Sequence, residues 1–435
     1  MNLPRTADIA IIGAGAAGLA AAISAGEAAG RDVSIVLLES AQRPGAKILV
    51  SGGGRCNVTN QHVTPDDFYG GPRPTIRKVL GAFDDKQTIA WFTSLGVPLK
   101  LESSGKYFPS SNRARDVLDA LLHRVHQIGI PLVPGTPVTD IRLSPDGFEL
   151  RMVRSPTAPS PVHGAMCARR LIVATGGLAF PKSGSDGAGL AWMRRLGHTI
   201  IPTTPALTPL ILKKSTDLGG RLSQFSGVSF DARLRLYQET QAWPRRKLAQ
   251  VEGPVLLTHF GISGPATLDL SRHWLRAAHD DPAGRLRLYL GVLPLATTDA
   301  ADAWLREQGT DHPRRQISTT LRDILPVRLA EAFAAEVGRE TPLSQLDRKA
   351  RRRLAETLTM LELPVVGTRG YTHAEATAGG IDLREIDART MESRLVPGLY
   401  LCGEILDVDG RIGGFNFQWA WSSGHVAGRG AVASL

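Results

Sequence analysis

The stretch IAIIGAGAAGLAAAISAGEAA, residues 9–29, constrains the fold of this chain more than any other feature. An apolar run at 8–12 ends at Gly13, an alanine-rich stretch covers 16–29, and a second apolar run covers 33–38. Short apolar runs on both sides of a helical stretch are typical of two buried parallel strands joined by a crossover helix. The sequence therefore predicts a βαβ unit and an α/β fold with a central parallel sheet.

The glycines between the first strand and the helix have the spacing Gly13-x-Gly15-x-x-Gly18, and Glu39 ends the second strand. An acid about 20 residues after such glycines completes the dinucleotide-binding fingerprint. Gly13 permits a tight turn, Gly15 lets a pyrophosphate approach the backbone, and Gly18 lets helix and strand pack closely. The Glu39 carboxylate can accept hydrogen bonds from ribose hydroxyls, and its negative charge disfavours a 2′-phosphate. We therefore expect FAD or NAD rather than NADP as the bound dinucleotide.

The rest of the chain predicts one domain made from both ends and a second domain inserted between them. Residues 137–153 alternate like an antiparallel hairpin, and 168–177 and 398–405 read as further buried strands that end in glycine. We expect a discontinuous Rossmann-like domain over 1–196 and 366–435. The inserted domain, 197–365, is expected to be β-rich over 197–296 and helical over 297–365.

Three further glycine motifs favour FAD over NAD. ATGG, residues 174–177, ends a predicted strand, Gly403-Glu404 ends another, and Gly413-Gly414 precedes a helix. An NAD-only dehydrogenase would have little use for this C-terminal return to the sheet. The helix after Gly413-Gly414 resembles the one that, in FAD proteins of the glutathione-reductase type, aims its N-terminus at the pyrimidine edge of the flavin, where it would stabilise the anion that develops on reduction.

On these motifs the chain resembles the glutathione-reductase/fumarate-reductase-like flavoproteins, and among them the bacterial NAD(P)/FAD-dependent oxidoreductases described as aminoacetone-oxidase-like or bile-acid-reductase-like. The resemblance lies in GAGAAGLAAA, GAKILVSGGGRCNVTN, LLTHFGISGPATLDLS, AEATAGGIDLREID and the run from Met391 to Gly424. It implies an interrupted FAD-binding domain, Glu404 at the ribityl-pyrophosphate region, and Arg55 and Asn57 as donors to phosphate or flavin oxygens. The fumarate-reductase Arg/His set is not identifiable, so a dicarboxylate substrate is not expected.

The fingerprint, the glycine motifs and the resemblance together give the set of residues that we expect to bind FAD. It comprises Gly13, Gly15, Ala16, Ala17, Gly18, Glu39, Ser40, Lys47, Ser51, Gly52, Gly53, Gly54, Arg55, Cys56, Asn57, Val138, Thr175, Gly176, Gly177, Gly403, Glu404, Gly413, Gly414, Phe415 and Asn416.

Flavin chemistry needs a positioned cofactor and, for some substrates, a proton donor. His259 precedes a glycine turn and a helix start at Pro265, and an ordinary turn histidine is the alternative. His373 and Glu375 are spaced to share one face of a strand near the re-entry into the FAD domain, and a plain linking strand is the alternative. These residues are the candidate proton donors.

Cys56 is a further catalytic candidate. No second cysteine lies near it, which argues against a dithiol relay, while Arg55 beside it could lower the pKa of its thiol. The alternative is a small side chain packed against the flavin. The three cysteines also provide neither a disulfide framework nor a metal-binding pair, and no metal site is expected. On the last helix, Phe417 and Trp421 share a face, and packing in the core is the default interpretation for both and for Trp419.

Charge and composition limit the partners. The net charge of +10 allows an acidic partner, but the basic residues are scattered, and the densest run, 347–356, is typical of a solvated helix face. No stretch reaches the about 18 to 20 apolar residues of a membrane span, and no cleavable leader is evident, so a cytoplasmic protein is expected.

We expect an FAD-dependent oxidoreductase of a small hydrophobic or carbonyl-conjugated substrate, with NAD(P)H as a transient electron donor. The alternatives are an oxidase of amines or amino ketones that uses O₂, an RNA-modifying or RNA-binding flavoprotein, and a redox sensor without turnover. A nucleic-acid partner is not favoured, since no aromatic-interleaved basic patch is evident. The oligomeric state stays open.

Overall fold

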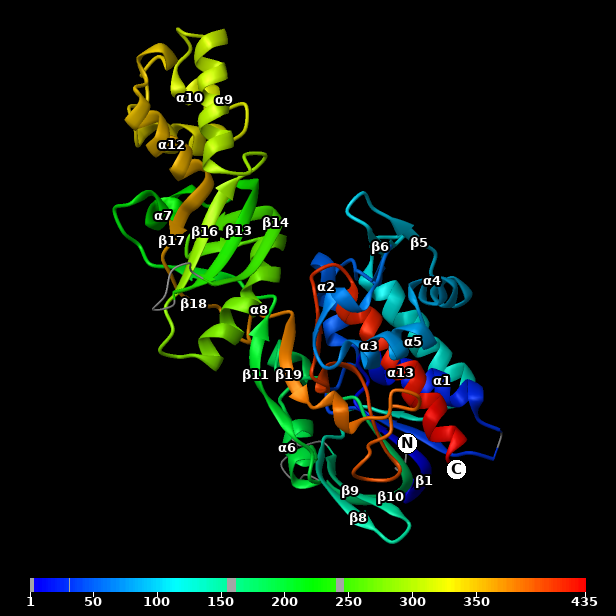
Figure 1. Cartoon of the computed structure of the whole chain (residues 1–435). Coiled ribbons are helices and arrows are strands. Elements are labelled where there is room, and N and C mark those ends of the chain that lie inside the picture. The colour runs from blue at the N-terminus through cyan, green and yellow to red at the C-terminus, as the bar shows by residue number, and fades with distance from the viewer. Residues whose placement is uncertain (1–3, 31, 155–161, 240–245) are drawn as a thin grey trace. The chain divides into compact units, whose positions relative to one another are not determined.

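The computed structural model describes residues 4–30, 32–154, 162–239 and 246–435 (Figure 1). The chain divides into two compact units. The split unit consists of Met1–Pro205 and Glu375–Leu435, and the inserted unit is Ala206–Ala374.

The split unit is built on a seven-stranded sheet with the order β7-β2-β1-β10-β9-β8, in which β20 also pairs with β10. The predicted βαβ unit is confirmed as β1 (Thr6–Ile12), α1 (Ala16–Ala28) and β2 (Ile35–Leu38), with β1 and β2 parallel. All four residues of β2 are buried, as its uninterrupted apolar sequence requires. The predicted hairpin is confirmed as β8 (Val138–Ser144) and β9 (Gly147–Arg154).

Strand β20 (Leu399–Leu401) joins this sheet from near the C-terminus. It runs parallel to the last residues of β10 (Val162–Val173), with Leu171 opposite Leu399 and Val173 opposite Leu401. The ATGG segment after β10 and the Gly403-Glu404 pair after β20 therefore emerge at the same edge of the sheet. This is the carboxyl edge, which also carries the loop after β1 and is the edge where open α/β sheets bind their ligands.

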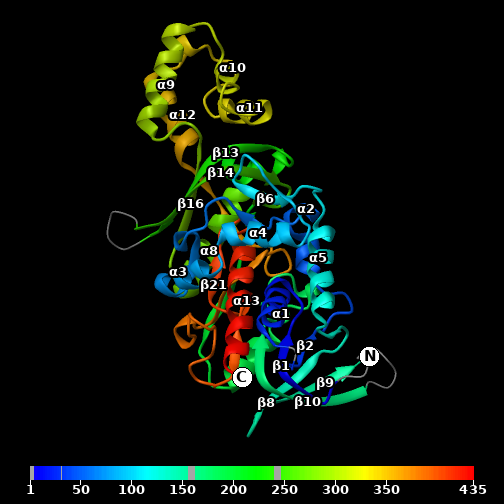
Figure 2. The ribbon, with the colours of Figure 1, turned by 90° about the vertical axis from the view of Figure 1, so that its right-hand side faces the viewer.

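The C-terminal helix α13 (Phe415–Ala433) packs along α1, as Figures 1 and 2 show. A Cβ at Gly424 would lie 2.4 Å from the carbonyl oxygen of Ala17, and one at Gly428 would lie 2.3 Å from that of Ala21. The close approach of the two helix backbones thus depends on glycine in α13 facing the alanine-rich surface of α1.

The remaining elements of the split unit cover this core or form small sheets beside it. In three small sheets β11 pairs with β19, β21 with β4, and β6 with both β3 and β5. The helices are α2 (Ala46–Gly54), α3 (Arg73–Ala82), α4 (Asp85–Ser94), α5 (Ala114–Ile128) and α6 (Ala188–Arg195), and the strands are β3 (Thr59–Asn60), β4 (Phe68–Gly70), β5 (Leu99–Leu101), β6 (Lys106–Pro109), β7 (Leu132–Val133), β11 (Ile200–Ala206), β19 (Ala376–Ile381) and β21 (Val408–Gly410).

The inserted unit has its own core under a second seven-stranded sheet, with the order β17-β16-β13-β14-β15-β12-β18. Its strands are β12 (Leu210–Leu212), β13 (Ser229–Gln238), β14 (Arg246–Thr258), β15 (Gly261–Ser263), β16 (Leu286–Val292), β17 (Leu361–Leu363) and β18 (Val365–Thr368). Its helices are α7 (Leu218–Arg221), α8 (Pro265–Asp280), α9 (Thr298–Asp311), α10 (Ile317–Leu321), α11 (Val327–Ala335) and α12 (Arg348–Met360).

The basic run 347–356 forms the first half of α12. Arg351 pairs with Asp302 at 2.8 Å and Arg352 with Asp299 at 2.6 Å, both on α9. Arg348, Lys349, Arg352 and Arg353 are exposed, which confirms the interpretation as a solvated helix face.

A buried polar network ties the segment after α6 to the segment before β20. His198, whose side chain is fully buried, places Nδ1 2.8 Å from Glu385 Oε2 and Nε2 3.0 Å from Ser393 Oγ. Ser393 Oγ also accepts the backbone N–H groups of Leu395 and Val396. Since both ring nitrogens of His198 are paired and its side chain is hidden from solvent, the role of the network is to hold these loops in place.

Replacing His198 by alanine is expected to destabilise the split unit by about 2–4 kcal/mol, because it leaves buried partners unpaired and opens a cavity. Urea unfolding followed by circular dichroism would measure this. His279→Ala, at an exposed position of α8, is the control and should unfold as the wild type does. An unchanged midpoint for His198→Ala would contradict a stabilising role for the network.

Candidate functional site

The three glycines of the loop after β1 have different roles: the packing of the fold requires two of them, and the third leaves space beside the backbone. Gly13 has φ +103°, and a Cβ there would lie 2.5 Å from the carbonyl oxygen of Ala174. A Cβ at Gly18 would lie 1.7 Å from the carbonyl oxygen of Gly13, whereas one at Gly15 would meet no atom within 4 Å. Gly13 and Gly18 are thus required by the fold itself, while Gly15 leaves an opening at the start of α1.

The open position at Gly15 lies at the N-terminus of α1, where backbone N–H groups are free to donate. Gly15 is the N-cap of α1 and provides no side-chain cap, and the first turn contains no acidic residue. In the part of the chain that the structure describes, no side chain accepts the N–H groups of Ala16 and Ala17. A helix N-terminus with free N–H groups and an adjoining space is suited to a phosphate.

Glu39 lies at the end of β2, and its side chain is buried beside this loop. Its Oε2 accepts the backbone N–H of Ala14 at 2.7 Å, and its Oε1 accepts that of Ala41 at 2.8 Å and the hydroxyl of Ser40 at 3.2 Å. A carboxylate has about four acceptor positions, so Glu39 can brace the loop and still accept ribose hydroxyls. Val138, at the start of β8, is buried. It follows Thr136 by two residues, and the backbone N–H of Thr136 donates to the carbonyl oxygen of Glu39.

Glu404 is held by two side chains from distant segments. Lys47 Nζ lies 2.7 Å from Oε2, and Thr377 Oγ1 donates to Oε1 at 2.7 Å. Thr377 Oγ1 in turn accepts the backbone N–H groups of Leu178 and Ala179, directly after the paired glycines. Lys47 and Glu404 are each about three-quarters buried. We call Lys47, Thr377 and Glu404 the Glu404 clamp.

Gly176 and Gly177 lie against this clamp. A Cβ at Gly177 would lie 2.5 Å from Thr377 Oγ1 and 3.1 Å from Glu404 Oε1, and one at Gly176 would lie 2.8 Å from Ser185 Oγ. Thr175, just before them, has a buried hydroxyl without a partner among the described residues. Thr377 was missed from the sequence, although it lies in the family-like motif AEATAGG, which is the signal that could have indicated it.

The N-terminus of α13 is a second opening of the same kind as that of α1. Gly414 is its N-cap with φ +94°, and neither a side-chain cap nor a first-turn acid is present. With its amide oriented to satisfy both groups, Asn57 donates to the Thr59 carbonyl and accepts the Gly414 N–H, each at 3.0 Å. The Asn416 amide is bonded twice to the Gly410 backbone at 2.9 Å. Asn57 and Asn416 therefore brace the loops around this helix end.

Within the segment SGGGRC, residues 51–56, the three glycines and Cys56 adopt a left-handed backbone. Gly52, Gly53 and Gly54 have φ of 56°, 68° and 83°, values that favour glycine, and they interrupt the regular geometry of α2. A Cβ at Gly53 would meet nothing within 4 Å. Ser51 donates its hydroxyl to the Ile48 carbonyl. Backbone conformation thus requires glycine at all three positions, and at Gly52 a Cβ would also lie 3.0 Å from the Phe108 ring, whereas the backbone at Gly53 is open.

Arg55 follows the glycines and is bonded within the protein. Its Nη1 lies 2.7 Å from Glu102 Oε1, and its guanidinium carbon stacks 3.9 Å from the centroid of the Phe108 ring. Its Nε also lies 3.4 Å from the Gly52 carbonyl oxygen. That Arg55 donates to a cofactor oxygen stays a prediction.

Cys56 is fully buried, and this burial raises the pKa of its thiol to about 12. The expectation that Arg55 lowers this pKa is wrong, because the guanidinium is turned toward Glu102 and desolvation dominates. A protonated, inaccessible thiol is a poor nucleophile, so the geometry favours the packing interpretation.

The three cysteines give a direct test of this difference. Cys402 is likewise buried, with its pKa raised to about 12, whereas Cys167 is exposed on β10. We expect Ellman's reagent to titrate one thiol in the native protein at pH 8 and three in denaturant, and Cys167→Ser to abolish the native signal. Rapid native reaction of Cys56 in that variant would restore it as a nucleophile.

The two candidate histidines lie in the inserted unit, and both are exposed. His259 is in the turn between β14 and β15, with its ring edge-on to Phe260. His373 lies in a turn after β18, where its N–H donates to the Gly370 carbonyl. The predicted strand with His373 and Glu375 on one face is wrong, because the chain turns at Gly370 (φ +65°) and β19 begins only at Ala376.

The aromatic residues of α13 are packed in the core. The Phe417 and Trp421 rings stack with centroids 5.5 Å apart, which confirms their shared face. Trp419 donates to the Gly403 carbonyl at 3.2 Å, and Trp421 donates to that of Val58 at 2.9 Å. Phe415 packs edge-to-face on Phe68. The indole donors therefore tie the loops of the site to the last helix.

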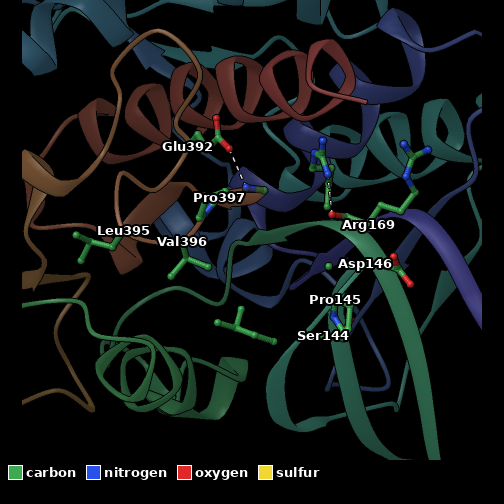
Figure 3. A pocket seen from close by; sticks show the side chains of 12 residues that line it. Ser144, Pro145, Asp146, Arg169, Glu392, Leu395, Val396 and Pro397 are labelled. Carbon is green, nitrogen blue, oxygen red and sulfur yellow. Dashed lines mark hydrogen bonds between the residues drawn. The ribbon is translucent and has the colours of Figure 1, made fainter.

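A surface pocket of about 510 Å³ lies at the opposite edge of the sheet (Figure 3). It is lined by the β8–β9 turn around Pro145 and Asp146, by Arg169 of β10, and by Leu395–Gly398, directly before β20. It therefore lies near the amino ends of the parallel strands. It contains none of the predicted site residues, and we assign it no role.

The residues at the carboxyl edge fit an extended dinucleotide such as FAD. Pyrophosphate requires N–H donors and space, which the two uncapped helix N-termini and the open position at Gly15 provide. Ribose and the ribityl chain require hydrogen-bond acceptors, which Glu39 and Glu404 still have free. Among the described residues no cluster of three His, Cys, Asp or Glu side chains could hold a metal ion, and no helix is both long and apolar enough to cross a bilayer.

Comparison with known proteins gives concordant results. A family model described as the HI0933-like protein Rossmann domain matches residues 7–430. The 3-dehydro-bile acid delta(4,6)-reductase of Clostridium scindens is 32% identical over 98% of both chains. The ribosomal RNA dihydrouridine synthase of Escherichia coli is also 32% identical over 98% of both. The 3-ketosteroid delta1-dehydrogenase of Sterolibacterium denitrificans shares the fold, with a TM-score of 0.50, 11% identity, and coverage of 99% of this chain and 100% of that one.

Proposed function

Since the chain belongs to the HI0933-like Rossmann-domain family and is an FAD-dependent oxidoreductase, we propose that it reduces a carbon–carbon double bond conjugated to a carbonyl group. The observation that carries this proposal is the 32% identity, over 98% of both chains, to a bile-acid reductase. Its name describes the reduction of double bonds at positions 4 and 6 of a 3-oxo steroid, which are conjugated to the carbonyl.

The chemistry agrees with the site. Bound FAD, once reduced, supplies a hydride, and a conjugated carbonyl makes the β-carbon of the double bond electrophilic enough to accept it. The chain then has to bind the cofactor, orient the substrate and provide a proton. Glu39, the Glu404 clamp and the two open helix ends would hold FAD.

We propose NADH or NADPH as the electron donor. The sequence contains one dinucleotide fingerprint, which FAD would occupy, so the nicotinamide is expected to dock transiently. An oxidase that passes electrons to O₂ is the alternative use of the same flavin.

A second substrate class, uridine in ribosomal RNA, is favoured by two observations. One relative of equal identity is a ribosomal RNA dihydrouridine synthase, and the net charge of +10 suits a polyanion. The C5–C6 double bond of uracil is also conjugated to a carbonyl, at C4. The two classes therefore share one reaction.

Anaerobic titration of the purified flavoprotein with NADH and NADPH tests the donor. The reduced protein is then mixed with 4-androstene-3,17-dione or with protein-free ribosomal RNA. We expect one of them to reoxidise the flavin and to gain two hydrogens, measured by mass spectrometry. Reoxidation by O₂ alone would contradict the reductase and favour the oxidase. Salt-sensitive reaction with RNA but not with the steroid would identify the second class.

A further inference from the structure

The segment that joins β10 to α6 emerges at the carboxyl edge of the first sheet and has not yet been given a function. We call residues 180–187 of this segment the strap. Its backbone is left-handed at Phe180 (φ +53°), Gly184 (φ +94°) and Gly187 (φ +80°), and two of these three positions are occupied by glycine, which adopts the conformation without strain. The left-handed residues lie at both ends and in the middle of the strap, so the chain turns sharply at each of them.

Both ends of the strap are anchored within the split unit. Just before it, the backbone N–H groups of Leu178 and Ala179 donate to Thr377 Oγ1 at 2.8 and 2.9 Å. Just after it, α6 packs so closely on Thr175 that a Cβ at Gly189 would lie 2.1 Å from the Thr175 hydroxyl oxygen. The strap is therefore a short loop between two fixed ends.

The middle of the strap lies against groups that we expect to hold FAD. A Cβ at Gly184 would lie 3.8 Å from Glu39 Oε1. One at Gly176 would lie 2.8 Å from Ser185 Oγ and 4.0 Å from Lys47 Nζ. Consecutive residues of the strap thus reach the acid at the end of β2 and the glycine pair beside the clamp. An extended dinucleotide that binds at both places has to pass the strap.

Few contacts hold the strap in this position. Across the residues that the structure describes, each of its hydrogen bonds stays within the strap or joins it to α6. Ser183 Oγ donates to the Phe180 carbonyl at 2.7 Å, and the Asp186 carboxylate accepts the N–H of Ala188 at 3.0 Å. Ser185 is buried, whereas the exposed residues of the strap are Pro181, Lys182, Gly184 and Asp186. A segment with fixed ends and a weakly held middle opens locally at small cost.

We propose that the strap is a lid on the cofactor site, which opens to admit FAD and closes over its ribose and pyrophosphate. In its closed position the strap blocks the path by which the dinucleotide enters or leaves, so its opening limits the rates of both steps. This inference rests on FAD binding at the carboxyl edge and is independent of the substrate that the flavin reduces.

A reversible disulfide tests the lid directly. A Cβ at Gly184 would lie 3.2 Å from Ser40 Oγ, so cysteines at these two positions are close enough to form a disulfide. The variant Ser40→Cys/Gly184→Cys is made in a Cys167→Ser background, which removes the exposed native thiol and leaves Cys56 and Cys402 buried. FAD uptake by the apoprotein and FAD release from the holoprotein are followed by flavin fluorescence, with the disulfide oxidised and reduced.

We expect oxidation of the double variant to slow both FAD uptake and FAD release at least tenfold, and reduction of the disulfide to restore both rates. The Cys167→Ser protein, treated in the same way, is the control and should show equal rates under oxidising and reducing conditions. Equal rates for the oxidised and the reduced double variant would overturn the lid.

Limited digestion with trypsin is a second test, which decides the proposal if the double variant does not fold. Trypsin binds an extended segment, so cleavage after the exposed Lys182 requires the strap to open. We expect FAD to slow the formation of the fragment 1–182 at least tenfold, measured by mass spectrometry. Cleavage after Lys214, which is exposed in a loop of the inserted unit, is the control and should be equally fast with and without FAD.

Two outcomes separate the lid from the cofactor assignment. Equal cleavage after Lys182 in the apoprotein and the FAD-bound protein would overturn the lid alone. A wild-type protein that binds no FAD would overturn the cofactor site together with the lid.

Discussion

Gly15→Ala is expected to give a protein that folds normally but binds FAD at least a hundredfold more weakly than the wild type. The Gly15 backbone, with φ −81° and ψ −169°, is accessible to alanine, and the new Cβ meets no protein atom within 4 Å. The methyl group would instead occupy the space through which a pyrophosphate reaches the N-terminus of α1. Fluorescence titration of the apoprotein with FAD and thermal unfolding of the apoprotein measure the two quantities separately.

Two other glycine-to-alanine substitutions serve as controls for this prediction. Gly81→Ala, in α3, also adds a Cβ with nothing within 4 Å and should leave FAD affinity unchanged. Gly18→Ala places a Cβ 1.7 Å from the Gly13 carbonyl oxygen and should destabilise the apoprotein itself. If Gly15→Ala bound FAD as tightly as the wild type, the loop after β1 would not be the pyrophosphate site.

Lys47→Met is expected to weaken FAD binding by about ten- to a hundredfold, the equivalent of about 1.5–3 kcal/mol for a charge-assisted hydrogen bond between largely buried groups. Lys47 fixes one oxygen of Glu404 and Thr377 the other. Without the ammonium group the carboxylate loses its orientation and its neutralising partner, so that it presents its remaining acceptor positions poorly to the ribityl chain. The same fluorescence titration measures the change.

The control for this substitution is Arg113→Met, which removes an exposed ion pair with Asp116. Exposed pairs contribute little, so this variant should match the wild type in stability and FAD affinity. Lys47→Arg should recover part of the affinity, because the charge is retained. An FAD affinity unaffected by Lys47→Met would exclude the Glu404 clamp from the cofactor site.

The local parts of this fold could be predicted from sequence because their signals lie within short windows. The βαβ unit, the β8–β9 hairpin and the charged face of α12 each follow from periodicity and turn residues in adjacent positions. The return of β20 to the first sheet also follows, since a short apolar strand ending in Gly403-Glu404 repeats the pattern of β1 and β10.

The side-chain partners could not be predicted, because they are set by tertiary packing. Arg55 pairs with Glu102, and Thr377 contacts residues 178, 179 and 404; no pattern in the sequence links these positions. The pKa of Cys56 depends on burial that arises only in the folded chain. At His373 the spacing suggested a strand, but Gly370 made a turn more favourable.

The pairing of β10 with β20 has a consequence for synthesis. The ribosome releases β1, α1 and β10 first, then the entire inserted unit, and only afterwards the strand and helix that complete the first sheet. The inserted unit can fold from segments that are close in sequence, while the end of β10 still lacks its partner strand β20. Nascent chains halted before residue 399 should therefore be prone to aggregation, and cofactor capture should be one of the last events in the life of the nascent chain.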